Sequence, residues 1–120
     1  MAKTFEELTV WQEARVLVGS VYADFGRGTP GHSDFGFKEQ VQRCVISIIN
    51  NIAEGFERES AADFARFLDM AKGSCGELRS MCYVAEDLGY VPAEVAAKRR
   101  RHAADIARGI AHLARRVRKK

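Results

Sequence analysis

The sequence predicts an all-α protein, an antiparallel up-down four-helix bundle that forms one domain over residues 1–120. Apolar residues recur at spacings of three, four and seven in four segments, as on one face of a helix. The segments are mostly separated by short connections that contain Gly, Pro or Ser, and short connections favour antiparallel neighbours. No segment alternates apolar and polar residues for long enough to predict a strand.

The first two helices flank the longest loop. We expect the first at about residues 5–25, with an apolar face made by Leu8, Trp11, Val18, Val21, Tyr22 and Phe25. Residues 26–33 are rich in turn formers and include Pro30, so they should form the loop. The second helix is expected at about residues 34–57, with Ser33 or Asp34 as its cap. Its apolar face would run through Phe37, Val41, Cys44, Ile48, Ile52 and Phe56.

The third and fourth helices are expected at about residues 61–88 and 92–117. Ser60 and Asp63 form a capping-box pattern, Gly89 suits a left-handed C-cap, and Pro92 suits a first helical turn. The apolar face of the fourth helix would include His102, Ile106, Ile110, Leu113 and Val117. Gly73 and Gly76 cost the third helix roughly 1 kcal/mol each relative to Ala. Either another helix approaches them closely, or they merely lower stability.

Composition limits the class of protein. With 47% hydrophobic and 29% charged residues the chain resembles soluble globular domains, and it lacks the run of about 20 apolar residues that spans a bilayer. The acidic N-terminal segment does not resemble a secretory signal, so we expect a cytoplasmic protein without a membrane role. Cys44, Cys75 and Cys82 form no Cys-x-x-Cys pair, which favours reduced thiols in the core.

Charge is distributed unevenly along the chain. Residues 1–97 carry 9 Lys and Arg against 15 Asp and Glu, a net charge of −6. Residues 98–120 carry 10 Lys and Arg against Asp105 alone, a net charge of +9. This polarity predicts either a surface for polyanions or contact between the acidic part of one subunit and the basic part of another.

The basic residues of the fourth helix form a stripe. A rotation of about 100° per residue places Arg101, Arg108, Arg115 and Lys119 roughly opposite its apolar face. We call these four residues the basic ridge, and with Arg116 and Lys120 they are candidate nucleic-acid ligands through phosphate contacts. The alternative is an ordinary soluble face with a frayed basic end. No aromatic residue interleaves with the arginines, so base stacking has no platform here.

The second helix carries a polar seam beside its apolar face. The seam is defined by Gln40, Arg43, Ser47, Asn51, Glu54 and Arg58, which recur at intervals of three and four residues. It is either a solvated face or a hydrogen-bonded network that fixes the register against a neighbouring helix or subunit. Ser74 and Glu77 on the third helix are its candidate partners.

Catalytic and cofactor signatures are missing from the sequence. None of His32, His102 and His112 lies three residues after a Glu, as a di-metal bundle site would require. The glycine pairs lack the Gly-Lys-Ser/Thr of a phosphate loop. No convergent acid, base and nucleophile can be identified, so we expect a protein that is not an enzyme and uses neither metal nor cofactor.

Three longer motifs occur between residues 5 and 92. They are Phe5-x-x-Leu8-x-Val10-Trp11-Gln12-x-Ala14, Gln40-x-x-Arg43-x-x-x-Ser47-Ile48-x-x-Asn51-Ile52-Ala53-Glu54-Gly55, and Phe64-x-x-Phe67-Leu68-x-x-Ala71-x-Gly73-Ser74-x-x-Glu77-Leu78. With these motifs and with Leu88-Gly89-Tyr90, the chain resembles the 23S rRNA intervening-sequence proteins, also called the S23-type four-helix-bundle family, over about residues 5–92.

The resemblance implies a small bundle that assembles into a ring-like homopentamer. It also implies kinship with the accessory variability proteins of diversity-generating retroelements, which associate with a reverse transcriptase and bind nucleic acid through a basic surface. Asn51, Glu54, Gly55, Ser74 and Glu77 would be signature residues with a mainly structural role. The leading hypothesis is therefore a homo-oligomer that binds RNA, DNA or a nucleoprotein partner. The alternative is an oligomeric scaffold without a nucleic-acid role.

Overall fold

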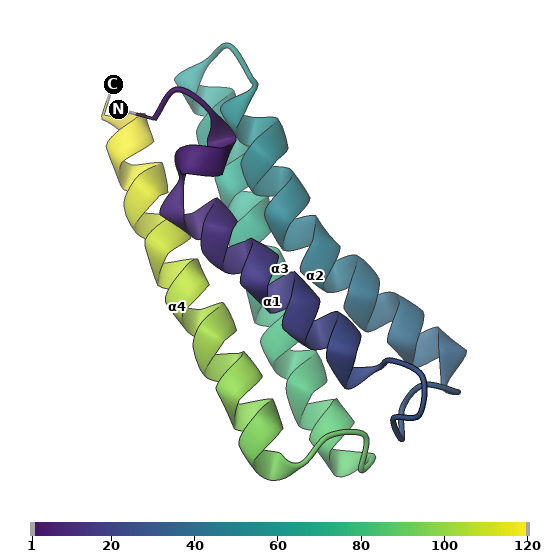
Figure 1. Ribbon diagram of the computed structural model, residues 1–120. Helices are drawn as coiled ribbons and strands as arrows, with labels where there is room; N and C mark the ends of the chain where they lie inside the picture. The colour runs from purple at the N-terminus through teal and green to yellow at the C-terminus, as the bar shows by residue number, and fades with distance from the viewer. Residues whose placement is uncertain (1, 120) are drawn as a thin grey trace.

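In the computed structural model, which describes residues 2–119, each α-helix runs antiparallel to the next (Figure 1). The helices are α1 (Thr9–Asp24), α2 (Phe35–Phe56), α3 (Ala61–Asp87) and α4 (Ala93–Arg118). α1 and α3 each contact both α2 and α4, so the four helices form a square bundle. Its extents are 46 × 20 × 20 Å. The expected all-α bundle is confirmed.

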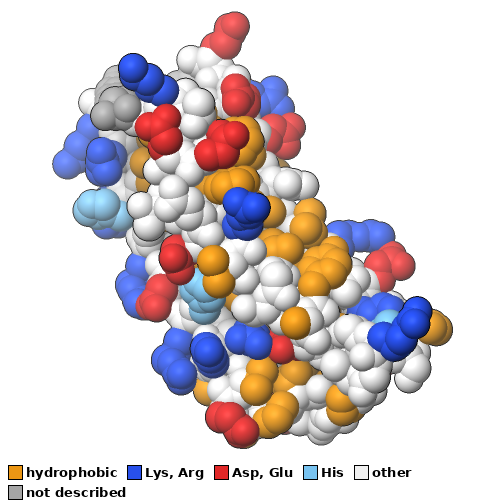
Figure 2. Space-filling model, in the orientation of Figure 1, with side chains coloured by type: hydrophobic (Ala, Val, Ile, Leu, Met, Phe, Trp, Pro, Cys, Tyr) orange, Lys and Arg blue, Asp and Glu red, His pale blue; other side chains and the backbone are white. Residues whose placement is uncertain are grey.

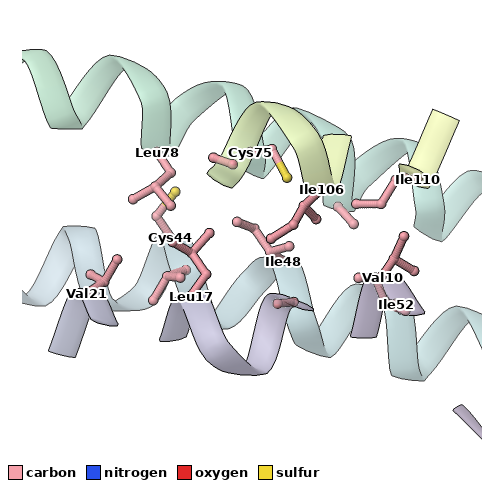
Figure 3. Packing of buried hydrophobic residues seen from close by; sticks show 14 of the residues in the cluster. Val10, Leu17, Val21, Cys44, Ile48, Ile52, Cys75, Leu78, Ile106 and Ile110 are labelled. Carbon is pink, nitrogen blue, oxygen red and sulfur yellow. The ribbon is translucent and has the colours of Figure 1, made fainter. Parts of the chain in front are cut away.

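The core is aliphatic and takes residues from all four helices. Leu17, Ile48, Leu78 and Ile110 are fully buried, and Figure 3 shows these side chains pointing toward one another along the bundle axis. Full burial of one such side chain stabilises the fold by about 1.5–3 kcal/mol. Among the helices formed by residues 2–119, none is both long and apolar enough to cross a bilayer.

The predicted start of the first helix, at about residue 5, is wrong, because α1 begins at Thr9. A separate 3-10 turn, η1 (Phe5–Glu7), precedes α1, and Leu8 between them has an extended backbone with φ −75° and ψ 125°. The Glu7 carboxylate accepts a hydrogen bond of 3.2 Å from the Thr4 backbone N–H, which closes the turn. The Gln12 side-chain amide donates to the Glu6 carbonyl at 2.8 Å and holds the turn against α1.

The buried face of α1 is also rotated from the expected one. Its centre is formed by Ala14, Leu17 and Val21, whereas Trp11 is only half-buried and Tyr22 is exposed. Because Ala14 is small, the α1 backbone can approach the core closely, and Leu17 then fills the interior. Of the expected stripe, Val21 and Phe25 are buried as predicted, whereas Leu8 and Val18, like Trp11, are only partly buried.

The helix ends are fixed by local hydrogen bonds. Asp34 caps α2 by accepting from the Phe37 backbone N–H at 3.2 Å, and Ser60 caps α3 by accepting from the Asp63 N–H at 3.0 Å. Gly89 ends α3 with φ +75°, the left-handed conformation expected there. Pro92 is the N-cap of α4 and not part of its first turn, so α4 begins one residue later than expected.

The close helix approach expected at Gly73 and Gly76 is not present among residues 2–119. A Cβ atom at either position would have nothing within 4 Å, and both glycines are exposed. The close approach occurs at Gly55, where a Cβ atom would lie 2.7 Å from Phe67 Cβ and 3.3 Å from the Phe64 carbonyl oxygen. Gly55 therefore sets the spacing between α2 and α3.

The three cysteines are buried as free thiols, as the sequence predicted. Burial is the main reason why the pKa of Cys44 and Cys75 rises to about 12 and that of Cys82 to about 11. All three thiols are therefore protonated near neutral pH, and a protonated thiol is a poor nucleophile. They act as small core residues.

Alanine substitutions should distinguish the closely packed Gly55 from Gly73, which has open space around it. Gly55→Ala gains about 0.5–1 kcal/mol of helix propensity, but overpacking against Phe67 costs about 1–3 kcal/mol, so we expect net destabilisation. In the matched variant Gly73→Ala, the added methyl meets open space, so the helix-propensity gain should remain. Urea denaturation followed by circular dichroism gives both values. A Gly55→Ala protein as stable as Gly73→Ala would contradict this packing.

A second prediction concerns the hydrogen bond that the Tyr90 hydroxyl donates to Asp34. This bond, followed by the Phe37 N–H, lowers the pKa of the Asp34 carboxyl. The stability that this hydrogen bond contributes is therefore fully present above the unfolded-state pKa of Asp, about 4. It is lost as pH falls through the lower pKa of Asp34 in the folded protein. Tyr90→Phe should destabilise the protein at neutral pH but not at strongly acid pH. Tyr22→Phe, which alters an exposed ring, is the control; a pH-independent loss in Tyr90→Phe would argue against the linkage.

Candidate nucleic-acid interface

The rotation of α4 about its axis decides which residues reach solvent. Its core face is made largely of small side chains, with Ile106 and Ile110 between them. With this face buried, Arg101, Arg108 and Arg115 lie on the opposite side and are exposed. The stripe expected from the sequence is thus directed outward. The buried residues of α4 are Ala96, Ala103, Ile106, Ile110, Ala114 and Val117.

Three other arginines of α4 are used to hold the bundle together. Arg99 makes two hydrogen bonds of 2.7 and 2.8 Å to Asp24 on α1, and both side chains are largely buried. Asp24 raises the pKa of Arg99, which stays charged. Arg100 pairs with Glu86 at 3.3 Å and lies over the ring of Tyr83, and Arg118 pairs with Asp69. These pairs tie α4 to both neighbouring helices.

The candidate nucleic-acid ligands differ from these structural arginines. Within residues 2–119, Arg101, Arg115, Arg116 and Lys119 make no ion pair, and all four are exposed. Arg108 pairs with Asp105 on the same helix, and its side chain is 73% exposed. Lys120 lies outside the described residues. Figure 2 shows Lys and Arg side chains along the edge of the molecule that α4 forms.

The basic ridge is long and lacks aromatic residues. From Arg101 to Lys119 it extends about 27 Å along the helix axis, at about 1.5 Å per residue. Exposed guanidinium and ammonium groups spaced along such a line suit a row of phosphates, whose counterions they would release. Exposed aromatic rings for base stacking do not lie on this face of α4 among the described residues. The arrangement therefore suits backbone contacts better than base recognition.

His102 does not lie in the core, although the sequence placed it on the apolar face. It sits at the edge of α4 toward α1, where its Nε2 atom is 2.8 Å from a Glu13 carboxylate oxygen and its side chain is 20% exposed. The small residue Ala103 takes the buried position beside it. Within the described residues, no three His, Cys, Asp or Glu side chains gather to hold a metal ion.

Part of the polar seam forms a network between α2 and α3. The hydroxyl oxygens of Ser47 and Ser74 are 2.9 Å apart, and the Asn51 side-chain amide donates to the Ser47 carbonyl at 2.8 Å and hydroxyl at 3.0 Å. The Cys44 thiol donates to the Ser74 carbonyl at 3.2 Å. These half-buried groups fix the register of the two helices by satisfying one another.

The remaining seam residues are not part of that network. Gln40, Arg43 and Glu54 are exposed; Arg43 pairs with Glu39 at 2.6 Å and Glu54 with Arg58 at 3.1 Å, both within α2. Glu77 is exposed as well, and its charge contributes to the raised pKa of Cys44. The centre of the seam therefore forms an interhelical contact, whereas its two ends are exposed to solvent.

Sequence reasoning missed the structural role of Arg99. It belongs to a basic run with Lys98, Arg100 and Arg101, and residue type alone does not distinguish Arg99 and Arg100, whose side chains are 16% and 21% exposed, from their exposed neighbours. Its partner Asp24 lies 75 residues earlier, at the end of α1. A helical projection could have indicated that Arg99 points toward the core, but not which carboxylate meets it.

The chain matches a known family over most of its length. A family model described as 23S rRNA-intervening sequence protein matches residues 6–112, which is most of the chain. The matched region includes all of α1, α2 and α3 and much of α4, and thus both the seam and part of the basic ridge. No curated protein matches the chain.

Proposed function

This chain belongs to the family of 23S rRNA-intervening sequence proteins, and from that premise we propose that it binds RNA or DNA through α4. The ligand is free nucleic acid or the nucleic acid of a nucleoprotein partner. The binding residues are the basic ridge with Arg116 and Lys120. The observation that carries the proposal is that Arg101, Arg115, Arg116 and Lys119 make no ion pair within residues 2–119.

The distribution of charge supports a defined orientation on the ligand. Residues 1–97 carry a net charge of −6 and would be repelled by phosphates, whereas residues 98–120 carry +9. A nucleic acid therefore meets the protein along α4. Because phosphates are the same in every sequence, we expect little base preference.

In this proposal the protein binds its ligand and catalyses no reaction. The three thiols stay protonated because burial raises the pKa of each to about 11 or 12, which removes the strongest candidate nucleophiles. His102 is engaged by the Glu13 carboxylate at the edge of α4 toward α1. Binding alone accounts for the exposed charge on α4. The proposed location is the cytoplasm, where nucleic acid is accessible.

We also propose that the protein acts as a homo-oligomer, a pentamer by family resemblance. Several large apolar side chains are exposed on the single chain, and contact with another subunit would remove apolar surface from water. In a retroelement setting, the assembly would accompany a reverse transcriptase. The exposed apolar residues are Val16 and Tyr22 on α1, Phe35 on α2, Met70, Tyr83 and Val84 on α3, and Leu88 just after α3.

A second candidate function follows from the same charge asymmetry. The acidic part of one subunit would meet α4 of another, and the oligomer would serve as a protein scaffold without nucleic acid. Light scattering across a salt series distinguishes the two candidates. An oligomer that dissociates at high salt and binds no RNA or DNA supports the scaffold.

The nucleic-acid function is tested by salt and by charge reversal. If about four phosphates are contacted, affinity for an RNA or DNA duplex should fall roughly 100-fold between about 50 and 200 mM salt. The double variant Arg101→Glu/Arg115→Glu should weaken binding to all sequences alike and lower the salt slope by about 2. Fluorescence anisotropy gives both quantities.

The matched control is Arg79→Glu/Lys72→Glu, which makes the same change of charge on the exposed side of α3. This control should bind nearly as the unmodified protein does. If the α4 and α3 variants lose affinity equally, the protein responds only to net charge and the basic ridge is not the binding site.

A further inference from the structure

A groove of about 1050 Å³ opens at the end of the bundle that carries η1 and the turn between α2 and α3. It is bordered by the C-terminal half of α4, which also holds part of the basic ridge. Figure 1 shows these segments, far apart in the sequence, meeting at one end of the molecule. The groove is larger than most pockets for small molecules, which hold about 300–1000 Å³.

The floor of the groove is apolar and incompletely covered. Leu8, Phe56, Phe64 and Leu113 are only half-buried, although all four pack against the core or against one another. The rings of Phe56 and Phe64 meet edge to face with centroids 5.7 Å apart. The floor is continued by Val10 and Val117, which are nearly buried. An apolar surface of this kind is stabilised when another apolar surface removes it from water.

The rim of the groove is positively charged. Arg58, Arg108, Arg115 and Arg116 line it, against two carboxylates, Glu7 and Glu59. Arg115 and Arg116 have no ion pair within residues 2–119. The start of α3 at Ala61 also borders the groove, and the positive end of its helix dipole adds to the potential.

We propose that this groove binds an acidic amphipathic α-helix from a partner protein. Leucine-like side chains of that helix, spaced three and four residues apart, would cover Leu8, Phe64 and Leu113. Carboxylates on the flank of the helix would pair with Arg115 and Arg116. An occupant that fits the apolar floor and the cationic rim must present apolar side chains and carboxylates within one segment.

The observations favour a helix over nucleic acid at this site. Phosphates would satisfy the rim but leave the apolar floor against polar groups, whereas a helix covers both. The site goes beyond the proposed nucleic-acid role, with which it shares Arg108, Arg115 and Arg116. Arg101 is on the basic ridge but does not line the groove, so variants at Arg101 separate the two functions.

The test uses the full chain and a designed, fluorescein-labelled peptide of about 16 residues. Leu occupies one helical stripe and Glu the flanks; a second peptide of identical composition scatters its Leu around the helix. We expect the first to bind at least about tenfold more tightly in anisotropy titrations. Equal affinity of the two peptides would overturn the proposal, because charge alone would then explain binding.

Variants locate the site. Leu113→Ser in the floor and Arg116→Glu on the rim should each weaken binding of the amphipathic peptide about fivefold or more, a loss of roughly 1 kcal/mol. Arg101→Glu should leave peptide affinity nearly unchanged while weakening RNA binding. Arg116 is exposed, so this variant keeps the test decisive if Leu113→Ser fails to fold. Loss of peptide binding in Arg101→Glu with none in Arg116→Glu would overturn the proposal.

Two competitors distinguish other occupants. An RNA oligonucleotide of about 20 nucleotides should compete with the peptide only partly, because it does not cover the apolar floor. Laurate, an anionic amphiphile, should compete weakly because it fills little of the groove. Tight laurate binding without peptide binding would overturn the proposal in favour of a lipid-like ligand. Peptide binding without RNA binding would support the groove and reject the nucleic-acid function.

Discussion

The packing of α4 through its small residues is the constraint on which the rest of the structure depends. Ala96, Ala103 and Ala114 are buried almost completely, and Gly109 lies so close to α1 that a Cβ atom there would be 2.9 Å from Val10. These contacts allow only one rotation of the helix. That rotation buries Ile106 and Ile110, and it places the basic ridge on the opposite side in water. A larger residue at the core positions would turn the ridge as well as weaken the core.

The other helices complete a rigid support for this surface. Gly55 lets α2 and α3 approach, the network of Ser47, Ser74 and Asn51 sets their register, and the pair of Arg99 with Asp24 joins α4 to α1. The cations of α4 thus serve two purposes: some arginines form ion pairs that hold α4 to its neighbouring helices, and others remain available to a partner. Which arginine serves which purpose follows from its angle around the helix.

Much of the fold could be predicted from the sequence, because helical periodicity and caps are local. Four helices, the cap at Ser60 and the left-handed Gly89 were all indicated by neighbouring residues. The break at Leu8 was missed, because it depends on how η1 turns back through Glu7 and Gln12. The exposed surroundings of Gly73 were missed too, since a sequence gives the cost of a glycine but not its neighbours.

The candidate site also has one part that the sequence predicts and one part that it does not. The basic ridge was predictable because it lies on one helix with a regular repeat. The groove was not, since its floor joins Leu8, Phe56, Phe64 and Leu113 from four separate segments. The interhelical pairs of Arg99 and His102 also depend on tertiary contacts between residues far apart in the chain. Local patterns identify charged surfaces, whereas concave sites appear only when segments meet.

The central claim is that α4 presents its outward cations to a nucleic acid. Amide chemical-shift mapping by NMR during titration with a short RNA duplex tests it most directly. We expect the largest changes along α4 at Arg101, Arg108, Arg115 and Lys119, with small changes on α1 and α2. Changes centred on the α1 or α2 surface, or none at low salt, would contradict the claim.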